Sequence, residues 1–354
     1  IQLTCEWNVR NCSYPITTIR QAKAVELGSN GFLWNFCYVE ENAFTNTYLD
    51  ADIDYTQCSP GKATINSLFL NGDFVSNLIV RSKITLTDHS QFNGLIGGVM
   101  DTIYLNNCKI TIELDGEVSN AVGLTQLVRQ LYIYKTVFSF TANGDEVFGL
   151  VDTVTEECNI TLLDMTLNTR FNLESHGIGR TITNLTIQVC TLAINQLTDS
   201  TQQTSASVFG LLYGTQTINA SYINYKMVGK LTNVATVSNL VNQDPVDNLM
   251  INALMLKMQI KSYNVVGGVL GLISNKSESN GQIKIQNIIM EGEIDCRDAM
   301  NTLVLSCSQV IGNMNDGLTM GISLQNITSS VCGPTRISNK EEINQNVILD
   351  QNQC

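Results

Sequence analysis

The sequence has few of the residues that break strands, carry charge or catalyse reactions. Of 354 residues, only four are proline, and charged residues make up 15%. The 20 lysine and arginine residues, against 32 acidic ones, form no cluster, which argues against nucleic acid and anionic membranes as partners. The longest apolar run, residues 265–273, is about half as long as a membrane-spanning helix. We therefore predict no nucleic-acid partner and no membrane span in this segment.

Signatures of catalysis and metal binding are equally scarce. His89 and His176 are the only histidines, and neither a Cys-x-x-Cys nor a His-x-x-x-His pattern occurs. The His176-Gly177 step resembles one in pectin-cleaving β-helices, but their companion signatures are absent. The acidic pairs Asp152 with Asp164 and Glu156 with Glu157 lack surrounding aromatic residues that could hold a sugar. We predict no catalytic residue, no metal and no cofactor, and keep a polysaccharide-cleaving enzyme as an alternative.

The chain does contain a degenerate repeat, with a period near 29 residues between about residues 63 and 330. One half reads apolar-x-apolar-x-x-apolar, and its copies start at Ile103, Ile160, Leu185, Leu249, Ile283 and Ile322. The other half is centred on a glycine, and its copies lie at Gly94, Gly123, Gly149, Gly177, Gly210 and Gly268, with Asn239 as a weaker one. A fixed period in this range is typical of a solenoid.

The repeat and the abundance of strand-forming residues predict an all-β fold. We expect a right-handed parallel β-helix (β-solenoid) of about 8–10 coils, with the apolar positions of the motif pointing inward. Residues 1–62 would form a small disulfide-stapled cap with a short helix within 18–27 and a strand over 47–55. Residues 63–331 would form the coils, and 332–354 a C-terminal cap or linker that continues in the natural protein.

The eleven cysteines divide by position along the chain. Eight flank the repeats and are disulfide candidates: Cys5, Cys12, Cys37, Cys58, Cys296, Cys307, Cys332 and Cys354. Cys108 and Cys190 share the sixth position of the strand motif three coils apart, about 14 Å at ordinary strand spacing, which is too far for a disulfide. They are therefore expected to be buried thiols. Cys158 is assigned to an outward position, where it is either free or bonded to a neighbouring chain.

Six Asn-x-Ser/Thr acceptors for N-glycosylation occur, at Asn11, Asn159, Asn184, Asn219, Asn275 and Asn326. The repeat register places Asn159, Asn184 and Asn219 at outward offsets on three consecutive coils. We therefore predict a local stripe of glycans on one face. Together with the cysteines at both ends, these acceptors indicate a secreted or cell-surface protein.

The chain resembles GLUG-type repeat proteins over about residues 14–330. The copies nearest to that pattern are Val266-Gly267-Gly268-Val269-Leu270-Gly271, Gly94-Leu95-Ile96-Gly97 and Phe209-Gly210-Leu211-Leu212-Tyr213-Gly214. The Tyr48-Leu49-Asp50-Ala51-Asp52-Ile53-Asp54 segment is similar to the strand that leads into such repeats. The resemblance implies a large, adhesin-like extracellular surface protein with a β-solenoid stalk. It brings no catalytic residues.

The function that we expect is that of a structural or adhesive β-solenoid, secreted and N-glycosylated. It would be a stiff stalk or the subunit of a cell-surface or extracellular filament. Its partners would be further copies of itself, head-to-tail or lateral, or other extracellular proteins, with covalent N-glycans on its surface. A carbohydrate-binding adhesin is the other alternative to the enzyme.

Overall fold

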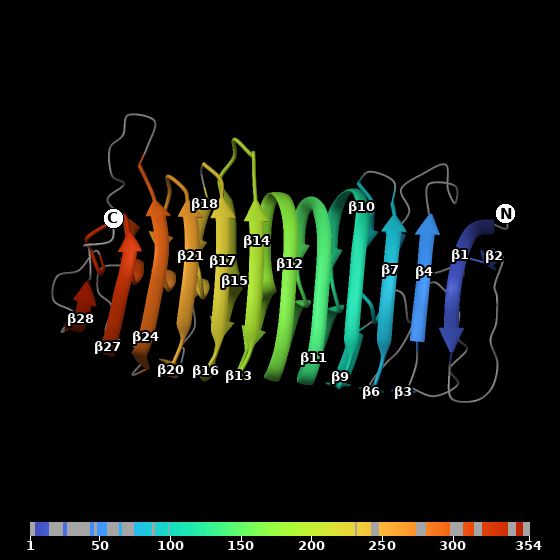
Figure 1. Ribbon diagram of the computed structural model, residues 1–354, viewed down its shortest axis with the longest axis horizontal. Helices are drawn as coiled ribbons and strands as arrows, with labels where there is room; N and C mark the ends of the chain where they lie inside the picture. Colours follow the sequence, from blue (N-terminus) through green and yellow to red (C-terminus); the bar gives the residue numbers. More distant parts are fainter. Residues whose placement is uncertain are drawn as a thin grey trace.

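The computed structural model of the chain describes its backbone in fourteen stretches and, within them, its side chains from residue 75 on, except at residues 99, 239–241, 345–347 and 349. The stretches are 4–13, 24–26, 43–45, 48–54, 64–65, 74–86, 89–97, 99–230, 232–241, 248–273, 281–297, 307–314, 321–338 and 345–349. In this part of the chain, the strand is the only regular element, and parallel coils stack into a β-solenoid (Figure 1). The predicted all-β solenoid is confirmed.

Face 1 of the solenoid is a ladder of mostly seven-residue strands that pair in parallel from coil to coil. Its residues alternate between exposed and buried, as in β21, so each strand contributes side chains to the apolar core. The ladder contains β4 (Tyr48–Asp54), β7 (Ile79–Thr85), parts of β10 (Lys109–Val122), β11 (Thr125–Phe148) and β12 (Val151–Thr183), then β14 (Thr191–Leu197), β17 (Tyr222–Val228), β21 (Met255–Lys261), and the ends of β24 (Gln282–Asp295) and β27 (Gly321–Cys332).

Face 2 precedes face 1 in each coil, and face 3 follows it. Face 2 contains β3 (Ala43–Thr45), β6 (Phe74–Ser76), β9 (Val99–Asn106), β13 (Leu185–Gln188), β16 (Gln216–Asn219), β20 (Asn248–Asn252) and parts of β11, β12, β24 and β27. In later coils it begins with the end of β15 (Thr204–Tyr213) and with β19 (Ser238–Val241), β23 (Leu270–Ile273) and β26 (Ile311–Met314). Face 3 contains β5 (Thr64–Ile65), β8 (Gln91–Phe92), β18 (Thr232–Ala235), β22 (Val266–Gly267), β25 (Cys307–Ser308) and parts of β10, β11, β12 and β15.

Each coil turns from face 2 into face 1 through one residue with a positive φ. We call these nine residues the bend row: Asn77, Asn107, Lys135, Leu162, Val189, Ala220, Ala253, Asn287 and Asn326, with φ between 46° and 55°. The left-handed bend leaves two successive side chains outside before the next one enters the core. It therefore accounts for the double spacer in the apolar-x-apolar-x-x-apolar motif.

The bend row also corrects the predicted register of one coil. Cys158 pairs with Leu131 and Leu185, so the motif there is Cys158-x-Ile160-x-x-Leu163. Leu162, taken from the sequence as a core position, lies in the bend row and is 41% exposed. Cys158 is fully buried, so its assignment to an outward position is wrong.

The turn from face 3 back to face 2 is a stacked column of mostly small residues, which we call the glycine column. A Cβ on Gly123 would lie 1.9 Å from the carbonyl oxygen of Gly149, and one on Gly149 would lie 1.9 Å from that of Gly177. Adjacent coils approach too closely there for any side chain. His176 pairs with Ser207, so the residue that follows Gly177 in the column is Val208, whose Cα would lie 3.3 Å from a Cβ on Gly177. Gly210 lies instead beside Arg180, so its place in the predicted repeat is shifted.

The N-terminal end of the solenoid departs from the parallel pattern, whereas the C-terminal end keeps it. β1 (Thr4–Ser13) pairs antiparallel with β4 and with β2 (Ala24–Glu26), and β28 (Gln345–Leu349) covers part of β27 (Figure 1). The short helix predicted within 18–27 is wrong over Ala24–Glu26, which are a strand; residues 18–23 are outside the described part. β3 and β4 already pair in parallel with the next coil, so regular stacking begins before residue 63.

Candidate functional site

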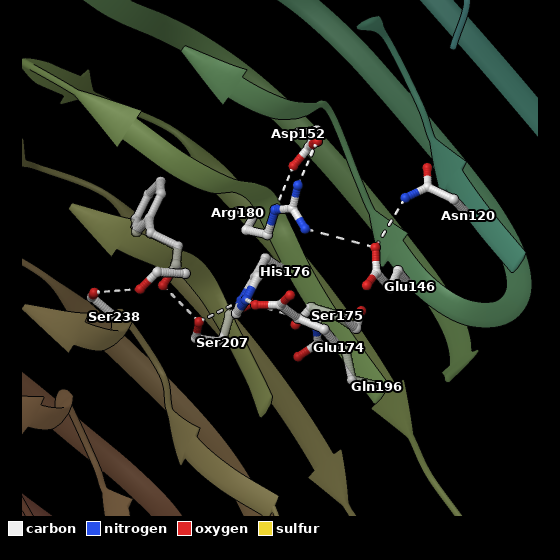
Figure 2. Close-up of polar contacts among 12 residues, drawn as sticks. Asn120, Glu146, Asp152, Glu174, Ser175, His176, Arg180, Gln196, Ser207 and Ser238 are labelled. Carbon is white, nitrogen blue, oxygen red and sulfur yellow. Dashed lines mark hydrogen bonds and ion pairs between the residues drawn. The ribbon is translucent and has the colours of Figure 1, made fainter. Parts of the chain in front are cut away.

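The densest group of polar side chains lies where face 3 turns into face 2, around the end of β12. Figure 2 shows Arg180 between Asp152 and Glu146, and His176 between Glu174 and Ser207. The residues are one coil apart along the chain: Asp152 and Arg180 are separated by 28 residues, and His176 and Ser207 by 31. Stacking of three coils therefore assembles the cluster.

His176 is fully buried and is held at both ring nitrogens. Its Nδ1 lies 2.8 Å from Ser207 Oγ, and its Nε2 lies 2.7 Å from Glu174 Oε1. The hydroxyl of Ser207 donates to the carbonyl oxygen of Phe209 at 2.6 Å. Because this bond uses the only proton of the hydroxyl, His176 must donate from Nδ1 to Ser207 Oγ.

The arrangement Glu174–His176–Ser207 resembles a nucleophilic triad, but the hydrogen bond between His176 and Ser207 has the opposite direction. A catalytic serine donates its proton to the histidine, which then acts as a base. Here the serine accepts from the histidine and donates to the backbone. In this arrangement the three residues form a buried polar brace between two coils.

Glu174 is the member of the brace whose carboxyl group is both ionisable and partly exposed to solvent. Burial would raise the pKa of its carboxyl, but the hydrogen bond from His176 and the positive charges of His176 and Arg180 outweigh burial and lower it. The side chain of Glu174 is 26% exposed, and Oε1 is the oxygen that faces His176. The carboxylate therefore stays ionised and keeps Oε2 available as an acceptor.

Arg180 links the brace to a second pair of carboxylates. Its Nη2 donates to Asp152 Oδ2 at 2.8 Å, its Nε lies 2.7 Å from Asp152 Oδ1, and its Nη1 lies 3.7 Å from Glu146. Phe148 stacks against His176 at 6.0 Å, and the guanidinium carbon of Arg180 lies 5.2 Å from the centre of the Phe148 ring. Burial raises the pKa of Asp152, and the charge of Arg180 opposes that shift.

A cavity of about 360 Å³ opens beside this cluster. Six of its lining residues form two rows that run from coil to coil: Glu174, Ser205 and Asn233 on the face 3 side, and Thr181, Leu211 and Leu272 on the face 2 side. Leu211 and Leu272 are half-buried on the outer surface. The cavity is thus a groove between a polar row and a largely apolar row.

The acidic pairs considered from the sequence are not brought together as a glycosidase requires. Asp152 is 6% exposed at the cluster, whereas Asp164 is exposed on face 1. Glu156 accepts from Arg129, and Glu157 accepts from Tyr132 at 2.7 Å and from Asn159 at 2.7 Å. Within the described part of the chain, no group of three or more His, Cys, Asp or Glu residues is placed to hold a metal.

The glycosylation acceptors that are described lie on face 2 or at its edges. Asn184 and Asn326 are exposed, and Asn159 and Asn219 are half-buried. Asn159 pairs with Thr186 and Asn219 with Gln188, so Asn159, Asn184 and Asn219 occupy three different positions along the strand and do not stack in one column. The side chain of Asn11 and all of Asn275 lie outside the described part. Glycosylation of these residues stays a prediction.

The cysteines at the C-terminal end include one described disulfide, between Cys296 and Cys307, with 6.3 Å between the Cα atoms. Cys332 is also disulfide-bonded. Cys37, Cys58 and Cys354 and the side chains of Cys5 and Cys12 lie outside the described part.

Cys108 and Cys190 are buried free thiols, as predicted, and the structure adds a role. Each follows a bend-row residue and lies close enough to donate to the carbonyl two residues back, Cys108 to Asn106 and Cys190 to Gln188. Thr136 and Ser221 make the same bond elsewhere in the ladder. At the sixth motif position, a small side chain with a donor can therefore bond across the bend, whereas other coils place leucine or isoleucine there.

No protein-family model matches the chain, and neither a curated protein nor a solved structure matches it. The resemblance to GLUG-type repeats therefore stays a prediction. No helix among the described residues is long and apolar enough to span a membrane.

Proposed function

We propose that the chain is a structural or adhesive β-solenoid, secreted and N-glycosylated, that is a stiff stalk or the subunit of a cell-surface or extracellular filament. The observation that carries this proposal is the ladder of face 1, which runs in parallel from β4 to β27. Each coil is bonded to its neighbours along its length, which makes a solenoid resist bending and stretching.

The N-terminal end of the solenoid favours a stalk or lateral association over head-to-tail growth. β1 covers the edge of β4 in an antiparallel sense, so a second molecule cannot add a parallel coil to β4. At the other end, β28 pairs in parallel with part of β27, as the strands of successive coils do.

An exposed apolar edge supports lateral association. Leu162 and Val189 in the bend row are 41% and 54% exposed, and Met255 and Ile289, which begin their face 1 strands, are 41% and 54% exposed. Asn326 lies in the same bend row, so a glycan there would confine the association to the coils before it.

Electron microscopy of native material, with mass spectrometry of the same sample, tests the proposal. We expect rods, bundled side by side or arrayed on a surface, and N-glycans on the exposed acceptors Asn184 and Asn326. Dispersed monomers without any array would reject the filament version, and unmodified acceptors would remove the glycoprotein part. Turnover of a polysaccharide that is abolished by His176→Ala or Asp152→Asn would replace the proposal with the enzyme alternative.

A further inference from the structure

The groove beside Arg180 has the chemistry of a carbohydrate site. We propose that it binds a short stretch of an unbranched, neutral polysaccharide laid along the solenoid axis. This site would exist whether or not the protein forms a filament, and it does not depend on the structural role.

The two walls of the groove match the two kinds of surface on a sugar ring. Glu174, Ser205 and Asn233 present a carboxylate, a hydroxyl and an amide on one side. Leu211 and Leu272 present apolar surface on the other. A pyranose has hydroxyl groups at its edge and C–H groups on its faces, so it can hydrogen-bond to one wall while it packs on the other.

The wall residues repeat at the spacing of the coils. Glu174 pairs with Ser205 and Ser205 with Asn233, while Thr181 pairs with Leu211, and Leu211 and Leu272 occupy the same position two coils apart. Each step is about 4.8 Å along the solenoid axis. A linear polymer repeats its hydroxyl groups and C–H faces at regular intervals along its axis, so it can lie against both walls over several coils.

The charges of the cluster favour a neutral ligand. Arg180 is already paired with Asp152 and lies near Glu146, and Glu174 is paired with His176. Glu174 and Arg180 both line the groove, so an anionic sugar would be repelled by the carboxylate of Glu174 and a cationic one by the guanidinium of Arg180. A hydroxyl donates to the free oxygen of Glu174 and also accepts from Arg180 without either penalty.

Asn233 supplies an independent sign of a missing partner. Its side-chain Oδ1 is buried and has no hydrogen-bond partner within the described part of the chain. A buried carbonyl oxygen without a donor costs about 1–3 kcal/mol. Because Oδ1 has almost no exposed surface, a ligand hydroxyl in the groove would supply that donor once the Asn233 side chain turns toward it.

The test is a binding titration of the full, enzymatically deglycosylated chain with linear oligosaccharides of glucose, mannose, xylose and N-acetylglucosamine. Oligogalacturonate and deacetylated chitin oligomers are the anionic and cationic probes. We expect at least one neutral series to bind, and to bind more tightly than either charged probe. Binding of charged probes alone, or no binding of any neutral series, would overturn the proposal.

Two variants locate the site. Leu211→Trp fills the groove and is expected to abolish binding, whereas the matched control Asn224→Trp, on the exposed surface of face 1, leaves it unchanged. Glu174→Gln removes a charged acceptor and is expected to weaken binding about tenfold. If Leu211→Trp does not fold, as judged by its circular dichroism, Thr181→Tyr narrows the same wall. Undiminished binding in a folded groove variant would place the sugar elsewhere and refute the assignment.

Discussion

Each coil turns at two corners that solve the same problem in different ways. At the bend row the backbone adopts a left-handed conformation and the side chain points outward, so Asn, Lys, Leu, Val and Ala all occur there. At the glycine column the backbones of adjacent coils approach so closely that Gly123 and Gly149 have no room for a Cβ. One corner constrains φ and leaves the side chain free, whereas the other constrains the side chain. The glycine column is therefore visible in the sequence, and the bend row is not.

The largest expected effect comes from breaking the glycine column with Gly149→Ala. The new Cβ would lie 1.9 Å from the carbonyl oxygen of Gly177 and 2.3 Å from Met165 Cε, so two coils must separate. We expect a loss of about 3 kcal/mol in the free energy of unfolding, measured by urea denaturation. Gly321→Ala is the matched control, because its nearest neighbour would lie 3.9 Å away. Equal losses in both variants would contradict the close-contact explanation.

The second-largest effect distinguishes the thiol of Cys158 in the core from the thiols that follow the bend row. Cys158→Ser places a hydroxyl in the core, where the described part of the chain shows no hydrogen-bond partner for this side chain, and should cost about 2 kcal/mol. Cys190→Ser should cost less than about 1 kcal/mol, because a hydroxyl there can donate to Gln188 as Ser221 donates to Asn219 at 2.9 Å. Unfolding midpoints of the two variants, measured side by side, check the order. The reverse order would refute the role assigned to the bend cysteines.

A smaller effect of opposite sign is expected at the bend row itself. Val189 has a β-branched side chain at φ 53° and is 54% exposed, so it bears the strain of a left-handed residue and loses little packing when replaced. Val189→Asn should raise the free energy of unfolding by about 1 kcal/mol. Thr191→Asn, two residues later in a strand, is the control and should give no gain. If both substitutions destabilise equally, the bend does not store strain.

The smallest effect is a pH dependence at the glycine column, where His176 braces two coils. The folded-state pKa of Glu174 is lower than its ordinary value of 4.5, so its ionised form stabilises the fold above about pH 4.5. That contribution disappears as the pH falls through the lowered pKa. The free energies of unfolding of the wild type and Glu174→Gln, plotted against pH, should therefore converge below pH 4.5. Asp152, whose pKa is shifted upward, is present in both proteins, so its titration does not change the difference between them. Parallel curves over this range would exclude the ion pair as the cause.

The period and the inward motif were enough to predict the solenoid, because they depend on core positions that repeat in every coil. The predicted register is wrong around Leu162, because the sequence does not distinguish an exposed leucine in the bend row from a leucine in the core. The same error in register led to the wrong prediction that the side chain of Cys158 points outward. The sequence equally did not reveal that Ala24–Glu26 pair with β1, a contact between segments outside the repeat.

Parts of the polar cluster were recognised singly from the sequence, but their association was not. The sequence alone indicates His176 and Asp152 as separate candidates for a catalytic residue. It does not indicate Glu174, Arg180 or Ser207. The signal that could have found them is the period itself: Arg180 follows Asp152 by 28 residues, and Ser207 follows His176 by 31. Polar residues that recur one coil apart are neighbours in space, even where no motif connects them.

The antiparallel cap has a consequence for how the chain acquires its fold during synthesis. β1 is translated before its main partner, β4 (Tyr48–Asp54), so the starting platform can form once β4 has left the ribosome. Every later strand of face 1 pairs with one that has already been translated. The order of synthesis is thus the order of stacking, and the growing solenoid can serve as the template for each new coil.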